Sequence, residues 1–188
     1  MKKLFVLIII ALCIVAPETM AQRYLASMRG LQVTAGSVNA LNYDKGFHTG
    51  IAFSQYTKRT DRLVFGFEYL EKSHSYKDIT VPQSQFTVDA GYYLKFISNA
   101  RKWLFVSVGA SGMAGYETVN WGEKLLFDGA TLENKDKFLW GAALTLETEI
   151  YLIDRLVLLV NIRERLLSGS SIGNLNTQFG LGIKVIIN

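Results

Sequence analysis

Apolar and polar side chains alternate along most of this chain with a period of two residues. In residues 176–188, for example, apolar side chains recur at every second position, and glycine, glutamine or lysine stands at most positions between them. Successive side chains of a β-strand point to opposite faces, so this period predicts strands that are apolar on one face and polar on the other. Helical periodicity is weak in comparison. The pattern therefore predicts an all-β fold.

The alternation divides the chain into eight candidate strands. They span residues 30–38, 46–57, 62–71, 83–96, 103–117, 137–152, 155–167 and 176–188. Short connections, at 58–61, 97–102 and 153–154, alternate with longer ones, at 39–45, 72–82, 118–136 and 168–175. Outer-membrane barrels combine tight periplasmic turns with longer outer loops in this way. We therefore predict an eight-stranded antiparallel up-and-down transmembrane β-barrel of the outer-membrane type, surrounded by outer-membrane lipid, with both mature termini in the periplasm.

The charged residues of the strands fall mostly on the polar face. An unpaired charge facing hydrocarbon costs about 2–4 kcal/mol at mid-depth, whereas an eight-stranded barrel encloses just enough room for side chains. We therefore expect a filled interior with an ion-pair network and no open channel. Its expected members are four acids and four bases: Glu68, Asp89, Glu147, Glu149, Lys95, Arg163, Arg165 and Lys184. The alternative is a soluble β-sandwich with these charges on its wet face.

Aromatic residues gather near the strand ends, as in the interfacial girdles of membrane barrels. The set comprises Tyr56, Tyr69, Tyr92, Phe96, Trp103, Tyr116, Trp140 and Tyr151. Two large residues of the strand at 103–117, Phe105 and Met113, do not fit either face. Glu164 interrupts an apolar row, and we expect it near a strand end at the interface.

The first 21 residues have the features of a secretory signal peptide. Lys2 and Lys3 precede an apolar run of about 13 residues, Leu4 to Ala16, which is too short to span a bilayer comfortably. Small residues before Gln22 predict cleavage there. We expect a signal peptide at 1–21 and one barrel domain at 22–188.

The composition of the mature chain excludes several kinds of chemistry. The only cysteine of the full sequence, Cys13, lies in the expected signal peptide, so the mature chain has none. Disulfides, thiolate catalysis and cysteine metal sites are therefore excluded. Its net charge is mild, since 18 basic and 15 acidic residues remain after Lys2, Lys3 and Glu18 are removed. The basic residues do not cluster along the sequence, and we expect no direct nucleic-acid binding.

The two histidines, His48 and His74, do not form a recognisable catalytic or metal-binding motif. His48 lies on the predicted inner face, and His74 lies in a predicted loop between Ser73 and Ser75. An outer-membrane acyl hydrolase is the enzyme alternative, but no nucleophile elbow supports it. We therefore expect no enzyme, no cofactor and no metal.

The connection at 118–136 is the candidate partner loop. Its candidate contact residues are Asn120, Trp121, Gly122, Glu123, Leu125, Leu126, Phe127, Asp128 and Gly129. Apolar residues in a loop that faces water either fold back over the barrel mouth or form a surface for a partner. Both alternatives remain open at the level of the sequence.

Several blocks resemble one family, the conjugative transposon TraO proteins of Bacteroidota. They are SYKDITVPQSQFTVDAGYYL at 75–94, AGYETVNWGEKLLFDGA at 114–130, YLIDRLVLLVNIRERLL at 151–167 and FGLGIKV at 179–185, with GLQVTAG at 30–36. The resemblance implies a non-enzymatic outer-membrane component of a type IV secretion apparatus for conjugative DNA transfer. It would contact other proteins of that apparatus, and the family has no assigned catalytic residues. The alternative function is a general small barrel for envelope integrity or adhesion.

Overall fold

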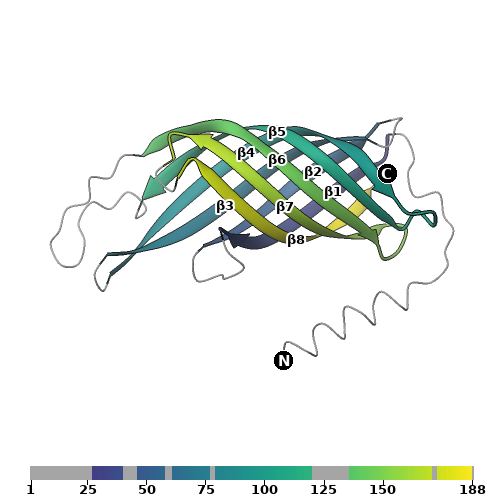
Figure 1. Ribbon diagram of the computed structural model, residues 1–188, viewed down its shortest axis with the longest axis horizontal. Coiled ribbons are helices and arrows are strands. Elements are labelled where there is room, and N and C mark those ends of the chain that lie inside the picture. Colours follow the sequence, from purple (N-terminus) through teal and green to yellow (C-terminus); the bar gives the residue numbers. More distant parts are fainter. Residues whose placement is uncertain are drawn as a thin grey trace, which may run out of the picture.

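The chain forms a closed antiparallel β-barrel (Figure 1). The computed structural model describes residues 27–39, 46–57, 61–76, 79–119, 136–170 and 173–187. The described residues form eight strands: β1 (Arg29–Val38), β2 (Phe47–Tyr56), β3 (Arg62–Tyr76), β4 (Ile79–Ser98), β5 (Leu104–Val119), β6 (Lys137–Tyr151), β7 (Leu156–Ser168) and β8 (Leu175–Ile187). Each strand pairs with the next along the chain, and β1 closes the barrel against β8. The predicted eight-stranded up-and-down barrel is confirmed.

The two ends of the barrel differ. At the turn end lie the connections β2–β3, β4–β5 and β6–β7, together with the start of β1 and the end of β8. The remaining four connections lie at the opposite end, which we call the loop end. Within the described part of the chain, no helix is long and apolar enough to cross a membrane.

One predicted loop is wrong. Residues 72–82 belong largely to β3 and β4, which run on as a hairpin that projects from the loop end (Figure 1). The register pairs Lys72 with Gln83 and Ser73 with Pro82, so His74 lies in a strand and not in a loop. Strand β4 pairs with β5 only from Gln83 onward. Among the described residues, Pro82 therefore has a β-neighbour on one side only, where a residue without an N–H group is tolerated.

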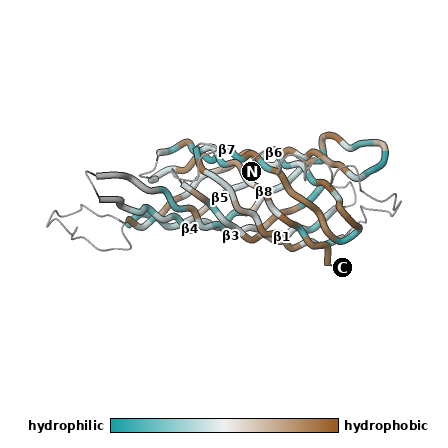
Figure 2. The backbone as a smooth tube through the Cα atoms, turned by 90° about the horizontal axis from the view of Figure 1, so that it is seen from below, coloured by the Kyte–Doolittle hydropathy of each residue, from teal (hydrophilic) through white to brown (hydrophobic). Residues whose placement is uncertain are grey.

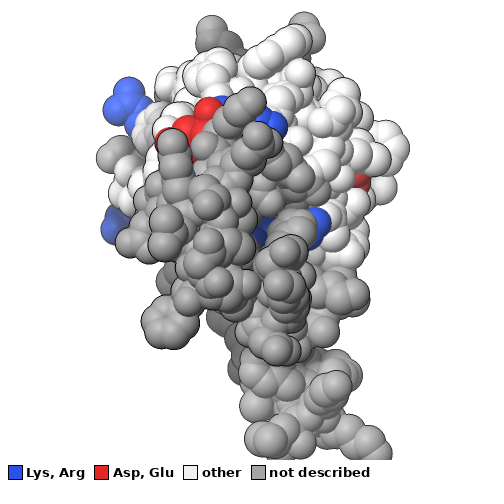
Figure 3. Space-filling view, turned by 90° about the vertical axis from the view of Figure 1, so that its left-hand side faces the viewer, with Lys and Arg blue, Asp and Glu red and all other residues white. Residues whose placement is uncertain are grey.

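The outer face of the barrel is apolar. Its most exposed side chains include Leu31, Val33, Ile51, Phe65, Phe67, Val88, Leu94, Leu144, Leu181 and Ile183. Apolar stretches recur along the wall, and the end that carries the C-terminus is strongly apolar (Figure 2). The part of the wall visible from the loop end carries few charged groups (Figure 3). A large exposed apolar surface is typical of a protein wall that contacts lipid.

The barrel interior also contains aromatic and large apolar residues. Phe105 and Met113, which the sequence assigns to neither face, are both buried inside. Tyr56 and Tyr151 are buried as well, so their assignment to an outer girdle is wrong. Both close the turn end from within, in a cluster with Met28, Phe105, Val157, Leu159 and Ile186. Of the other predicted girdle residues, Tyr92, Phe96, Tyr116 and Trp140 are exposed.

Two glycines provide a test of which face is packed. A Cβ atom at Gly36 would lie 1.9 Å from the Phe179 carbonyl oxygen and 2.6 Å from His48 Nε2, whereas one at Gly112 would meet nothing within 4 Å. We expect Gly36→Ala to lower the free energy of unfolding by about 1–3 kcal/mol through overpacking. Gly112→Ala should raise it by about 0.5–1 kcal/mol, since glycine weakens a strand. Urea unfolding followed by heat-modifiable gel mobility measures both, and equal shifts would contradict the assignment of faces.

Candidate functional site

The barrel interior holds three layers of polar side chains. The turn-end cluster comprises Arg62, Glu147, Glu149 and Lys184, with Tyr56 beside them. The central cluster comprises Glu68, Asp89, Arg163 and Arg165. The loop-end cluster comprises Gln83, Gln85, Glu117 and Ser170. The turn-end and central clusters join strands that are not neighbours in the barrel wall, so their contacts cross the lumen. The loop-end cluster joins the neighbouring strands β4 and β5 to Ser170, which follows β7.

The turn-end cluster is almost completely shielded from solvent. Arg62 on β3 places Nη2 2.6 Å from Glu147 Oε1 and Nη1 2.5 Å from Glu149 Oε1. Lys184 on β8 donates to Glu149 and lies 3.7 Å from Glu147. The Tyr56 hydroxyl donates to Glu149 at 2.8 Å. Two cations thus face two carboxylates, which is the condition under which buried charges are tolerated.

Aromatic rings complete the surroundings of the two cations. The Arg62 guanidinium carbon lies 4.9 Å from the centre of the Tyr93 ring, and Lys184 Nζ lies 5.5 Å from that of Tyr56. Both distances are within the range in which a ring face attracts a cation. The cluster therefore combines charge pairing with aromatic packing.

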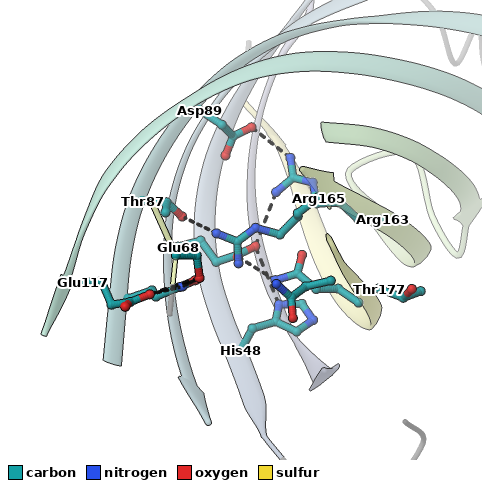
Figure 4. Close-up of polar contacts among 12 residues, drawn as sticks. His48, Glu68, Thr87, Asp89, Glu117, Arg163, Arg165 and Thr177 are labelled. Atoms are coloured by element: carbon teal, nitrogen blue, oxygen red, sulfur yellow. Dashed lines mark hydrogen bonds and ion pairs between the residues drawn. The ribbon is translucent and has the colours of Figure 1, made fainter. Parts of the chain in front are cut away.

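The central cluster, which Figure 4 shows, lies nearer the loop end than the turn-end cluster, because Glu68 follows Arg62 along β3. Arg163 bridges two acids, with Nη2 2.9 Å from Asp89 Oδ2 and Nη1 3.3 Å from Glu68 Oε2. Arg165 contacts the other oxygen of Glu68 at 3.0 Å and donates to the Thr87 hydroxyl at 3.4 Å. Glu68 consequently forms ion pairs with two guanidinium groups. This arrangement joins β3 and β4 to β7 across the interior.

His48 belongs to the central cluster. Its Nδ1 lies 3.7 Å from Glu68 Oε2, and its Nε2 lies 3.4 Å from the Phe179 carbonyl oxygen. Gln178 donates to Glu68 at 2.7 Å on the same side. These two contacts of the imidazole are therefore with a carboxylate and a carbonyl oxygen, and not with a serine hydroxyl. His74 lies in β3, and its side chain is outside the described residues.

Glu117 stands at the centre of the loop-end cluster. Gln83 and Gln85 donate to its two oxygens at 2.9 and 2.7 Å, and the Ser170 hydroxyl donates at 3.1 Å. Ser170 follows β7, so this contact ties the β7–β8 connection to β4 and β5. The carboxylate thereby accepts hydrogen bonds from two parts of the chain, β4 and the segment that follows β7.

The structure brings together all of the sequence-predicted interior charges except Lys95. Lys95 is half-buried near a β-bulge at the turn end of β4, and its backbone N–H donates to Asp61 Oδ1 at 3.2 Å. Its side chain forms no ion pair with the residues that the structure describes. Arg62, which the sequence analysis omitted, supplies the fourth cation. The sequence does contain a signal for Arg62. This residue lies an even number of residues before Glu68 in β3, so both side chains point to the same, inner face. Glu164, near the loop end of β7, accepts from Thr177 at 2.6 Å.

Thr118 and Val119, which the sequence analysis assigns to the candidate partner loop, belong to β5, whereas residues 120–135 of that loop lie outside the described residues. This applies to Asn120, Trp121, Gly122, Glu123, Leu125, Leu126, Phe127, Asp128 and Gly129. The two readings of that loop, as a cap or as a partner surface, thus remain predictions.

The described barrel holds a small polar cavity beside His48, Glu68 and Arg163. Its volume is about 40 Å³, which is enough to hold water molecules among its polar side chains. The apolar cluster around Tyr56 and Tyr151 fills the barrel beyond it, toward the turn end.

Known structures share this architecture. The attachment invasion locus protein Ail of Yersinia pestis aligns with a TM-score of 0.58 at 10% identity, covering 87% of this chain and 100% of that chain. Neisserial surface protein A aligns at 0.53 and 14% identity, covering 84% and 96%. The N-terminal β-barrel domain of Pseudomonas aeruginosa OprF aligns at 0.51 and 12% identity, covering 86% and 98%. At these identities the likeness concerns the fold alone, and the fold is that of small outer-membrane β-barrels. A search of curated proteins found no match.

The sequence itself carries a more specific relationship. The family model described as "Conjugative transposon protein TraO" matches residues 25–187. The chain belongs to the TraO family of conjugative transposon proteins.

Arg62 offers a direct test of the turn-end cluster. In Arg62→Met, Glu147 and Glu149 would both lose their ion pair with Arg62, and breaking a buried ion pair costs about 3–5 kcal/mol. We expect unfolding in detergent at a clearly lower urea concentration, with partial recovery in Arg62→Met/Glu147→Gln. The matched control Arg101→Met alters an exposed turn residue and should shift stability by less than about 0.5 kcal/mol. Equal midpoints for the Arg62 and Arg101 variants would contradict the assigned role.

The packed interior also predicts electrical behaviour. Purified protein in planar bilayers should give no discrete conductance steps under conditions in which a porin, as a positive control, gives them. We expect this because the apolar cluster and the crossing ion pairs of the described barrel stand in the way of an aqueous path through the turn end. Reproducible single-channel steps from the folded, heat-modifiable form would show that the interior opens.

Proposed function

We propose that this protein is a non-enzymatic outer-membrane component of a conjugative DNA-transfer apparatus of the type IV secretion class. The observation that carries the proposal is membership of the TraO family over residues 25–187. The apolar wall and the outer-membrane fold of its structural neighbours support a place in that membrane. In this proposal the barrel is an anchor whose ends contact other proteins of the apparatus.

The interior supports a structural role over a catalytic one. Its charged side chains are engaged in pairs that cross the lumen, as for Arg62 with Glu147 and Arg163 with Asp89. His48 contacts Glu68 and the Phe179 carbonyl oxygen, and it packs against Gly36. A general base must reach the proton that it removes in a substrate, and this imidazole lies within the packed core.

The proposed orientation follows from the two ends. We place the turn end in the periplasm and the loop end outside, because outer-membrane barrels have short periplasmic turns and longer outer loops. Cleavage before Gln22 would remove residues 1–21 and leave both mature termini in the periplasm. The partner contacts then lie on the loops, including residues 120–129, or on the periplasmic turns, and the DNA itself makes no direct contact.

A conjugation assay tests the proposal. A clean deletion should abolish transfer from donor cells, and wild-type protein supplied in trans should restore it. A chain in which a Gly-Ser segment of equal length replaces residues 121–129 distinguishes the two readings of the loop. If that loop binds a partner, the variant inserts normally by gel mobility and fails to restore transfer. If it only caps the barrel, transfer is restored.

Undiminished transfer after deletion, with normal assembly of the apparatus, would overturn the proposed function. A deletion strain that transfers normally but becomes sensitive to detergents, or loses adhesion, would support the alternative of a general envelope barrel. Attachment of a cysteine-reactive, membrane-impermeant label to Cys variants at Ser170 and at Arg101 reports the orientation separately. Labelling of Arg101→Cys in intact cells would contradict the proposed orientation, because it would place the turn end outside the cell.

A further inference from the structure

Exposed basic residues gather at the turn end. Arg29, Arg101, Lys102 and Arg155 are exposed, and none of them forms an ion pair with a described residue. The acids at this end are already engaged. Asp61 accepts hydrogen bonds from the Tyr92 hydroxyl and the Lys95 backbone N–H. Asp154 is engaged in a further interaction. The turn end therefore presents positive charge that the described chain does not neutralise.

The four basic residues lie on one continuous arc. Arg101 and Lys102 are in the β4–β5 turn, which is tied to the end of β6 by a bond from Tyr151 N–H to the Trp103 carbonyl oxygen at 2.8 Å. The β6–β7 turn is tied in turn to β8, because Ile186 N–H donates to the Arg155 carbonyl oxygen at 2.9 Å. Ile187 then pairs with Arg29 on β1. We call this arc the basic rim.

Exposed apolar side chains border the basic rim. Phe96 is 73% exposed, Ile153 53%, Ile97 52% and Ile187 46%. Phe96 continues the lipid-facing row of Leu94, and Ile187 continues that of Val185. The lipid-facing wall thus extends directly to the basic side chains. An apolar belt with cations at its edge matches a lipid, which has acyl chains beneath an anionic phosphate.

We propose that the basic rim binds the phosphate groups of anionic phospholipids in the membrane leaflet at the turn end. An acidic protein would meet the same charges but would leave the apolar residues beside them without a role. The choice of phospholipid over lipopolysaccharide, which also carries phosphates, rests on the orientation proposed above. The contact would hold the barrel at a defined depth in the membrane.

Lipid retention tests the rim. The full mature protein is placed in phosphatidylcholine vesicles with a minor share of phosphatidylglycerol, extracted with a styrene–maleic acid copolymer, and its lipids are quantified. We expect phosphatidylglycerol to be enriched about threefold or more around the wild-type protein. In Arg101→Gln/Lys102→Gln/Arg155→Gln the enrichment should vanish, while the charge-retaining Arg101→Lys/Arg155→Lys should keep it. Lys72→Gln removes one positive charge at the loop end. It is the control for loss of charge outside the rim and should leave the enrichment unchanged.

The outcomes separate the rim from the orientation. Gel mobility first establishes that each variant is folded. No enrichment by the wild-type protein, or equal enrichment by the triple glutamine variant, overturns the inference and leaves the proposed function intact. In a second arm with lipopolysaccharide in place of phosphatidylglycerol, rim-dependent enrichment there alone overturns the choice of phospholipid and the proposed orientation. Loss of transfer by a normally inserted triple variant, without any lipid enrichment, assigns the rim to an acidic protein and also overturns the inference.

Discussion

Charge pairing across a narrow lumen is the constraint on which the rest of this structure depends. A barrel of eight strands has room inside for side chains and little else, while its outer wall must be apolar to face hydrocarbon. Ionised groups that point inward consequently have no bulk water to solvate them. They are tolerated here because Glu147 and Glu149 meet Arg62 and Lys184, and because Glu68 and Asp89 meet Arg163 and Arg165. Each pairing also fixes the distance between strands on opposite sides of the barrel.

The same constraint explains how much of the fold is visible in the sequence. A one-residue slip of register would turn every inward charge toward lipid, so the alternation has to be strict where both faces have strong requirements. Strand β6 shows this: Glu147 and Glu149 point inward, while Leu144 and Leu146 point out. Strand number, strand order and the inner face of the charged residues are predictable for this reason.

Prediction fails where one of the two requirements is relaxed. At the turn end, large apolar residues such as Tyr151 and Phe105 fill the interior, so apolar character no longer identifies the lipid-facing side. Beyond the membrane-facing wall, β3 and β4 continue as a hairpin through Pro82, where polar residues give no alternation to follow. Arg62 illustrates a third case. It is the first residue of β3, and a position at a strand boundary gives no sequence evidence of which charges it meets across the lumen.

The distribution of chemistry in the molecule also locates its function. An interior whose charges are mutually engaged contributes stability and register, and it leaves little capacity to bind a further molecule. The wall is committed to lipid. Structural neighbours of 10–14% identity share the barrel fold, so the fold alone does not distinguish this family from other small barrels. What remains specific to this chain lies at its two ends, in the loops and projecting hairpin at one end and the basic rim at the other. The rim can act on a membrane or a partner because its cations, unlike those of the interior, form no ion pair with a described carboxylate.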